Sequence, residues 1–146
     1  MKRNEIAKAY AEALPLNAIS IEEIVAWADS IILEEDEPCI EIIELAFCSK
    51  GSDAITYLNL LSVGADEEAS IRFLFSLCYK ALKDGLTDYS AVAKRLFFWS
   101  MYETELDGFN ELGSFWDDLD LANEGIVGEP EVVKKEILDF LSENKA

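Results

Sequence analysis

YSAVAKRLFFWSMY, residues 89–102, is the stretch that decides the predicted fold. Ten of its fourteen side chains are apolar or aromatic, which leaves Lys94, Arg95 and two serines for water. At 3.6 residues per turn these apolar side chains surround most of a helix, and such a helix is usually buried. It is too short to cross a bilayer, which needs about 20 apolar residues. The stretch therefore predicts a buried central helix over residues 88–106.

The rest of the chain predicts further helices to pack around this one. Ser20, with Glu23 three residues later, is a capping box before an apolar run, and Gly64 and Gly85 are typical helix ends. We find no convincing alternation of apolar and polar residues, as a half-buried strand would show. The sequence therefore predicts a single all-α domain, residues 1–146, a bundle of about seven to eight helices. Apart from the central helix, these span about 4–14, 21–34, 38–48, 52–63, 66–84, 114–123 and 131–143.

Composition indicates a folded protein with an unusually acidic surface. Thirty acidic residues against twelve basic ones give a formal charge of −18, while 51% of the residues are hydrophobic, enough for a core. Such a surface repels nucleic acid and anionic lipid and attracts basic partners, although solubility alone also explains it. Cys39, Cys48 and Cys78 lack the spacing of a disulfide framework or zinc site. With no secretory signal or membrane span, they predict buried, reduced thiols in a cytoplasmic protein.

The residue types exclude most catalytic machinery. The chain has no histidine, which removes Ser-His and Cys-His pairs and histidine-ligated metals, and it has no phosphate-binding glycine motif. The remaining candidates are Asp117, Asp120 and Glu124, which share one helix face at i, i+3 and i+7. They would suit a Mg²⁺-dependent hydrolase, but a solvated face of an amphipathic helix explains them as well. We predict a non-enzyme without cofactor or metal.

Two long tracts lack basic residues, and these define the predicted binding surfaces. Between Lys8 and Lys50, and again between Arg95 and Lys134, there are ten acidic residues and no basic one. Acidic clusters beside Trp27 and Trp116 would offer charge and aromatic anchors to a basic protein, unless the tryptophans belong to the core. The predicted partner-binding residues are Glu34, Glu35, Asp36, Glu37, Glu41, Glu44, Asp117, Asp118, Asp120 and Glu124, with Glu103, Glu105, Asp107 and Glu111 beside the second cluster.

The segment Glu22–Phe47, EEIVAWADSIILEEDEPCIEIIELAF, resembles segments of small helical immunity proteins from bacterial polymorphic-toxin and contact-dependent inhibition systems. The shared pattern is an amphipathic helix with Trp27, the turn Asp36-Glu37-Pro38, and an apolar helix with Glu41 and Glu44. The resemblance covers under a fifth of the chain and implies tight binding to a cognate toxin, often a basic nuclease. It transfers no binding residues, because such families diverge where they touch their toxins.

Three functions remain open on the sequence. The first is an immunity protein that neutralises a basic toxin domain, with no direct contact to nucleic acid or membrane. The second is a general acidic adaptor, and the third is the Mg²⁺-dependent carboxylate hydrolase. We expect the first, because the uncompensated charge extends over both base-free tracts.

Overall fold

The computed structural model describes residues 1–98 and 111–146, and the side chains of residues 111–113 are not described. All regular structure in this part is helical, which confirms the all-α prediction. The helices are α1 (Arg3–Ala13), the 3₁₀ turn η1 (Leu14–Leu16), α2 (Ile21–Glu34), α3 (Ile40–Ala46), α4 (Gly51–Leu61), α5 (Glu67–Lys83), α6 (Tyr89–Phe98), α7 (Glu111–Asn123) and α8 (Pro130–Asn144).

Helix α5 forms where the sequence predicts it, for local reasons. The Asp66 carboxylate accepts a hydrogen bond from the Ala69 amide at 2.8 Å, which caps the first turn. Gly85 ends the helix with φ +71°, and the Leu86 amide donates to the Ala81 carbonyl at 2.9 Å. The apolar stripe of the helix faces the core, with each of these side chains buried: Ile71, Leu74, Phe75, Cys78 and Leu82.

Replacing Ser20 with alanine is expected to destabilise the domain by about 1 kcal/mol. The Ser20 hydroxyl accepts a hydrogen bond from the Glu23 amide at 3.2 Å, and alanine would leave that amide at the start of α2 without its cap. Urea unfolding monitored by circular dichroism measures the loss. Ser142→Ala is the matched control, because Ser142 is exposed inside α8, where alanine is favourable. Equal midpoints for the two variants would contradict the role of this cap.

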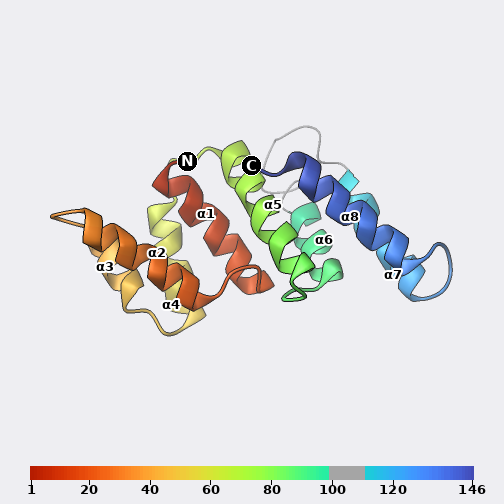
Figure 1. Ribbon diagram of the computed structural model, residues 1–146, viewed down its shortest axis with the longest axis horizontal. Helices are drawn as coiled ribbons and strands as arrows, with labels where there is room; N and C mark the ends of the chain where they lie inside the picture. Colours follow the sequence, from red (N-terminus) through yellow and green to blue (C-terminus); the bar gives the residue numbers. More distant parts are fainter. Residues whose placement is uncertain (99–110) are drawn as a thin grey trace.

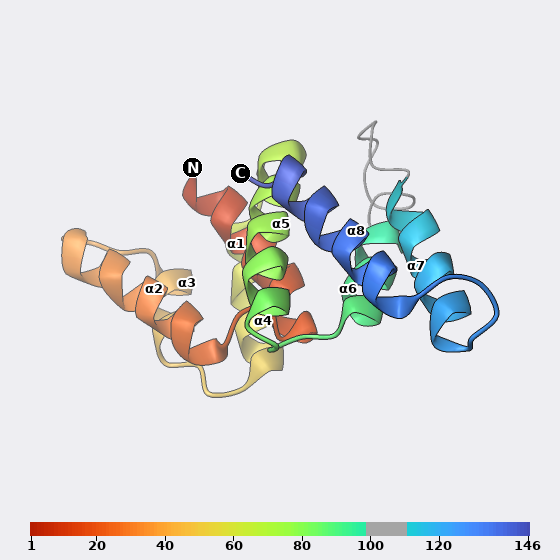
Figure 2. The ribbon, with the colours of Figure 1, turned by 45° about the vertical axis from the view of Figure 1, so that its right-hand side comes forward.

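The helices pack in a row whose spatial order differs from their order along the chain. Following the main contacts, α2 packs on α3, α3 on α4, α4 on α1, α1 on α5, α5 on α8, α8 on α7, and α7 on α6. Figure 1 shows the result, an elongated molecule with α2–α4 at one end, α1 and α5 in the middle, and α7 and α8 at the other end. The rotated view in Figure 2 shows the same separation of the two ends.

Stacked aromatic rings join the middle of the molecule to the α7–α8 half. The ring of Phe140 on α8 lies 5.8 Å from that of Phe75 on α5 and 5.6 Å from that of Phe115 on α7, both centroid to centroid. The chain end is tied to the same place, because the Ala146 amide donates to the Arg72 carbonyl at 3.0 Å. These contacts hold α8 against α5, with Ile137 and Leu141 also buried.

The predicted central helix keeps its apolar character but not its central position. Val92, Ala93 and Leu96 of α6 are buried, and Asp88 caps the helix by accepting from the Ala91 amide at 3.1 Å. However, the described part packs mainly against α7 and α8, and it is α5 that lies between the two halves. Lys94 and Ala91 are exposed, so α6 is not enclosed on all sides. The remainder of the predicted helix, residues 99–106, lies outside the described residues.

One predicted helix start and two predicted buried positions are wrong. The third helix begins after Cys39 rather than at Pro38. Its buried side chains are Ile42 and Leu45. Phe47, which belongs to the apolar stripe of the predicted helix 38–48, is instead 83% exposed. Val132, which belongs to the apolar stripe of the predicted helix 131–143, is likewise 55% exposed. Short amphipathic helices have broad apolar stripes, and the neighbour that docks decides which edge of the stripe is covered.

Candidate functional site

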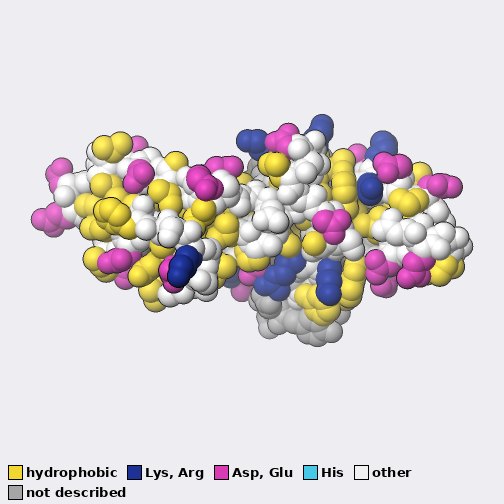
Figure 3. Space-filling view, turned by 90° about the horizontal axis from the view of Figure 1, so that it is seen from below, with side chains coloured by type: hydrophobic (Ala, Val, Ile, Leu, Met, Phe, Trp, Pro, Cys, Tyr) yellow, Lys and Arg dark blue, Asp and Glu magenta, His cyan; other side chains and the backbone are white. Residues whose placement is uncertain are grey.

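Acidic side chains concentrate at the two ends of the molecule. On the face shown in Figure 3, Asp and Glu side chains are prominent at both ends, and most Lys and Arg side chains lie over the middle. Eight of the ten predicted partner-binding carboxylates are exposed, and the other two, on Glu35 and Glu41, are half-buried. We call the end formed by residues 21–48 the α2–α3 end. The α7–α8 end carries the second predicted cluster.

The two predicted clusters do not form one surface. Glu34, Glu35, Asp36, Glu37, Glu41 and Glu44 lie on the last turn of α2, the following turn and α3. Asp117, Asp118, Asp120 and Glu124 lie on α7 and directly after it. Helices α2 and α7 are at opposite ends of the elongated molecule (Figure 1). The two clusters are therefore separate surfaces, and a partner bound at one end does not have to contact the other.

The first cluster is partly compensated by a contact that sequence spacing could not reveal. Arg3 on α1 forms an ion pair with Glu35, 32 residues away. Local i,i+4 pairing cannot supply such a contact, because the tract between Lys8 and Lys50 contains no basic residue. Among the described residues, Glu35 is the one member of the ten with an ion pair. The others stay uncompensated at the α2–α3 end and on α7.

Both tryptophans are packed against other rings of the same chain. The indole of Trp27 lies 5.2 Å from the ring of Tyr10, at an interplanar angle of 86°. The indole of Trp116 lies 5.8 Å from Phe97, and the Lys94 ammonium is 5.5 Å from its centroid. Each tryptophan is half-buried against the core. The structure therefore favours the alternative in which the indoles are mainly structural.

The carboxylates of α7 do not form a metal centre in the described part. No group of three or more His, Cys, Asp or Glu side chains there is arranged to hold a metal ion, and that includes Asp117, Asp120 and Glu124. Asp118 accepts a hydrogen bond from the Ser114 hydroxyl at 3.0 Å. Glu103, Glu105 and Asp107 of the predicted second cluster lie outside the described residues, as does the side chain of Glu111.

A hollow between α7 and α8 brings apolar and acidic side chains together. We call this hollow, of about 270 Å³, the α7–α8 groove. The carboxylate side chains at the groove are Asp118, Glu129 and Glu136. Its other lining residues are Leu121, Val127, Gly128, Val132 and Val133. Val127 is 64% exposed and Val132 55%. The groove therefore combines exposed aliphatic surface with negative charge.

The turn between α7 and α8 is what presents these aliphatic side chains to solvent. Gly125 and Gly128 both have positive φ, and the Ile126 amide donates to the Leu121 carbonyl at 2.9 Å, closing the end of α7. The chain reverses within a few residues, so Ile126 and Val127 remain outside both helices. Sequence reasoning missed this site, although the apolar pair Ile126-Val127 between two glycines in an acidic turn was a signal for it.

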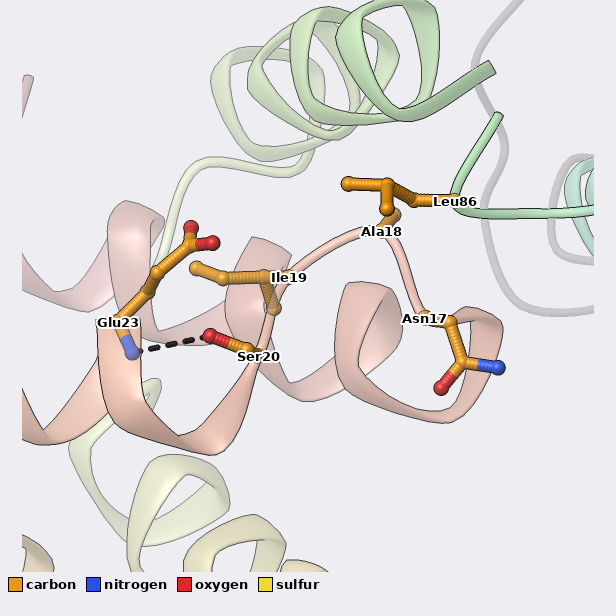
Figure 4. Close-up of a pocket in the computed structure, with 6 residues that line it drawn as sticks. All are labelled: Asn17, Ala18, Ile19, Ser20, Glu23 and Leu86. Atoms are coloured by element: carbon orange, nitrogen blue, oxygen red, sulfur yellow. Dashed lines mark hydrogen bonds between the residues drawn. The ribbon is translucent and has the colours of Figure 1, made fainter. Parts of the chain in front are cut away.

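Another hollow lies where the α1–α2 turn meets the loop after α5. It has a volume of about 320 Å³ and is lined by Asn17, Ala18, Ile19, Ser20, Glu23 and Leu86. Figure 4 shows Leu86 reaching over Ala18, with Asn17 pointing away from it. A smaller adjoining hollow adds Lys80 and Asp84 to Glu23. Charges of both signs meet here, so this place selects no class of charged ligand.

The three thiols differ in burial, which corrects the prediction that all are buried. Cys78 is buried, Cys48 half-buried and Cys39 exposed, and all are free. Burial raises the pKa of the Cys78 thiol to about 12. The pKa of Cys48 is also raised, first by burial and then by the Asp53 and Glu44 carboxylates. At the same end, Glu44 is the main cause of the raised pKa of Tyr57.

These differences predict the order of reaction with a thiol reagent such as dithiobisnitrobenzoate at pH 8. Cys39 is expected to react first and Cys48 more slowly, while Cys78 reacts only after unfolding, because the thiolate is the reacting species and burial suppresses it. Release of nitrothiobenzoate, with and without urea, counts the thiols. Cys39→Ser should remove the fast phase and leave the other two. A fast phase that survives in Cys39→Ser would contradict the assignment.

Stability is expected to fall as the pH rises from about 9 towards 12. A thiol whose folded pKa is raised stays neutral in the fold, while the unfolded chain ionises above its ordinary pKa, so alkali favours unfolding. Tyr10 contributes in the same direction, because burial first and Glu23 second raise its pKa. Urea midpoints measured between pH 8 and 11.5 test this. Cys78→Ala should show a smaller fall over the same range, and an unchanged fall would exclude Cys78 as a cause.

Comparison with known proteins does not assign the chain to a family. No protein-family model matches it, and searches of curated proteins and of solved structures gave no significant match. In the described part of the chain, no helix is both long enough and apolar enough to cross a membrane. The features of the molecule that point to a function are its acidic ends and the α7–α8 groove.

Proposed function

We propose that this chain is an acidic inhibitory binding protein of the immunity type, which binds and neutralises a cognate basic toxin domain in the cytoplasm. A nuclease is the best candidate for the partner, because carboxylates on the chain would take the place of nucleic acid phosphates in a basic substrate path. The observation that carries the proposal is the exposed, mostly uncompensated set of carboxylates at the two ends of the molecule.

Physical chemistry supports such a role in two ways. Complementary charge accelerates association and selects a basic partner, while exposed apolar side chains supply the buried anchors from which most binding energy comes. Both ends expose such side chains: Leu33, Ile40 and Phe47 at the α2–α3 end, and Ile126, Val127 and Val132 at the α7–α8 end. Three free thiols are consistent with a reducing compartment such as the cytoplasm.

The experiment is co-expression of the chain with the basic product of its neighbouring gene. We expect the two to co-purify at 0.1 M salt and to separate at 1 M, because the Debye length falls from about 10 Å to about 3 Å. The partner alone should be toxic or nucleolytic, and the complex inactive. A neighbouring product that neither binds nor loses activity would contradict the proposal.

One observation favours an acidic adaptor as the second candidate. The two acidic ends lie apart in an elongated molecule, so each end has room to bind a different basic protein (Figure 1). Light scattering of the complex separates the two functions. One partner per chain with loss of its activity supports the inhibitor, whereas two partners per chain with activity retained supports the adaptor. The described α7 carboxylates do not converge on a metal position, so no observation favours the Mg²⁺-dependent hydrolase.

A further inference from the structure

We propose that the α7–α8 groove is the docking site for the partner, and that it takes an aliphatic side chain flanked by lysine or arginine. This inference rests on the proposed function and specifies which end of the molecule binds and what it recognises. The occupant is a segment of a basic protein, as the groove's size, its aliphatic lining and its charge indicate.

The size of the groove favours a side chain over a free small molecule. Its volume of about 270 Å³ lies below the ~300–1,000 Å³ of pockets that enclose drug-sized ligands. The groove is also open, because its aliphatic side chains Val127 and Val132 are more than half exposed. An open hollow of this size suits one or two anchoring side chains from a protein surface, the usual centre of an interface.

The aliphatic lining comes from three consecutive parts of the chain. Leu121 belongs to the last turn of α7, Val127 to the connecting turn, and Val132 to the first turn of α8. In the unbound protein, these exposed aliphatic side chains are in contact with water, which costs a free energy of about 25 cal/mol for each Å² of apolar surface. Covering them with an apolar partner side chain recovers that free energy. The groove therefore favours an aliphatic occupant.

The charges at the groove determine what must flank that occupant. Asp118 lies one helical turn before Leu121 on α7, and Glu136 lies one turn after Val132 on α8, so each carboxylate borders the apolar surface on its own helix. Glu129, just before α8, adds a third carboxylate at the connecting turn. The nearby lysines are engaged elsewhere: Lys134 pairs with Glu131 and Lys135 with Asp139. Lysine or arginine side chains on either side of the aliphatic occupant would therefore pair with these three carboxylates.

The other hollows match such a segment less well. At the α2–α3 end, a hollow of about 390 Å³ includes Glu22 and Asp29, but the most exposed apolar side chains of that end, Leu33 and Phe47, do not line it. The extension of the hollow beside Leu86 combines Lys80 with Glu23 and Asp84, so its mixed charge does not select a basic segment. The α2–α3 hollow and the α7–α8 groove both carry charge of one sign. Of these two, the α7–α8 groove is the one whose lining includes branched aliphatic side chains that are more than half exposed, Val127 and Val132.

Synthetic hexapeptides test the inference on the whole folded chain. The peptide KKLIKK is expected to shift the methyl resonances of Leu121, Val127, Val132 and Val133 in NMR titrations at low salt. KKGGKK, which keeps the charge without the aliphatic pair, should bind at least about ten-fold more weakly, equivalent to about 1.4 kcal/mol. EELIEE should not bind, because its charge is repelled.

A matched pair of variants separates loss of the groove from loss of the fold. Val132→Lys places a positive charge in the groove and should weaken KKLIKK at least about ten-fold. Val63→Lys, at a valine after α4 that is 78% exposed against 55% for Val132, should not weaken it. Three results would overturn the inference: equal binding of KKLIKK and KKGGKK, shifts centred on Leu33, Ile40 and Phe47, or no shift with any peptide. The proposed function survives each of these if the basic partner still co-purifies and is inhibited.

Discussion

Phe75→Ala is expected to lower the free energy of unfolding by about 3–5 kcal/mol, the cost typical of removing a large buried aromatic side chain. Phe75 has no exposed surface, and its ring packs on Phe140, which in turn packs on Phe115. The substitution therefore leaves a cavity where α5, α7 and α8 meet. In a domain whose total stability is about 5–15 kcal/mol, this is a large fraction.

The measurement is urea and thermal unfolding followed by circular dichroism. A loss of this size should lower the melting temperature by roughly 10 °C in a chain of this length. Phe47→Ala makes the same chemical change at a ring that is 83% exposed, and it should alter the stability by less than about 0.5 kcal/mol. Similar losses for both variants would show that the α5–α8 junction is not where the fold is held together.

The second large effect concerns partner binding. Reversing the three charges at the α7–α8 groove, with Asp118→Lys, Glu129→Lys and Glu136→Lys together, is expected to weaken binding of the co-purifying basic partner by about 100-fold or more. Placing like charges opposite one another costs several kcal/mol, and each 1.4 kcal/mol is ten-fold in affinity. The association rate should fall most, because these carboxylates steer the encounter.

The matched control reverses three charges at the other end, Glu34→Lys, Asp36→Lys and Glu37→Lys. Both triple variants change the net charge equally, so a general electrostatic effect would weaken both to the same degree. Surface plasmon resonance at 0.05 and 0.15 M salt gives the rates. If the α2–α3 variant lost more affinity for the partner than the groove variant, the interface would lie at the α2–α3 end instead. Circular dichroism melts check the fold, since Glu129→Lys also removes a favourable charge before α8.

The candidate site could be predicted from the sequence only in part. The composition shows that acidic residues exceed basic ones and that two tracts lack bases, and Asp118 already belonged to the predicted set. Glu129, Glu136 and Val132 were not singled out for binding, because each is ordinary on its own helix. They become a site when α7 and α8 pack side by side, a contact between residues that local periodicity does not specify.

The two tryptophans also show that sequence proximity does not determine which side chains pack together. Trp27 and Trp116 stand beside acidic clusters in sequence, which made them candidate anchors. In the fold, Tyr10 covers one indole and Phe97 covers the other. The covering residue is 17 positions away in the first case and 19 in the second, beyond the reach of any i,i+4 pattern.

By itself, the sequence determined the helices, their caps and the total charge of this protein. Helix α5 illustrates why: its cap at Asp66, its apolar stripe and its end at Gly85 all depend on contacts within a few residues. Tertiary structure alone decided the order in which the helices pack, the separation of the two acidic ends, the pairing of Arg3 with Glu35, and the groove between α7 and α8. A broad apolar stripe favours burial without specifying the neighbour, so docking over long sequence distances chooses which side chains stay in water.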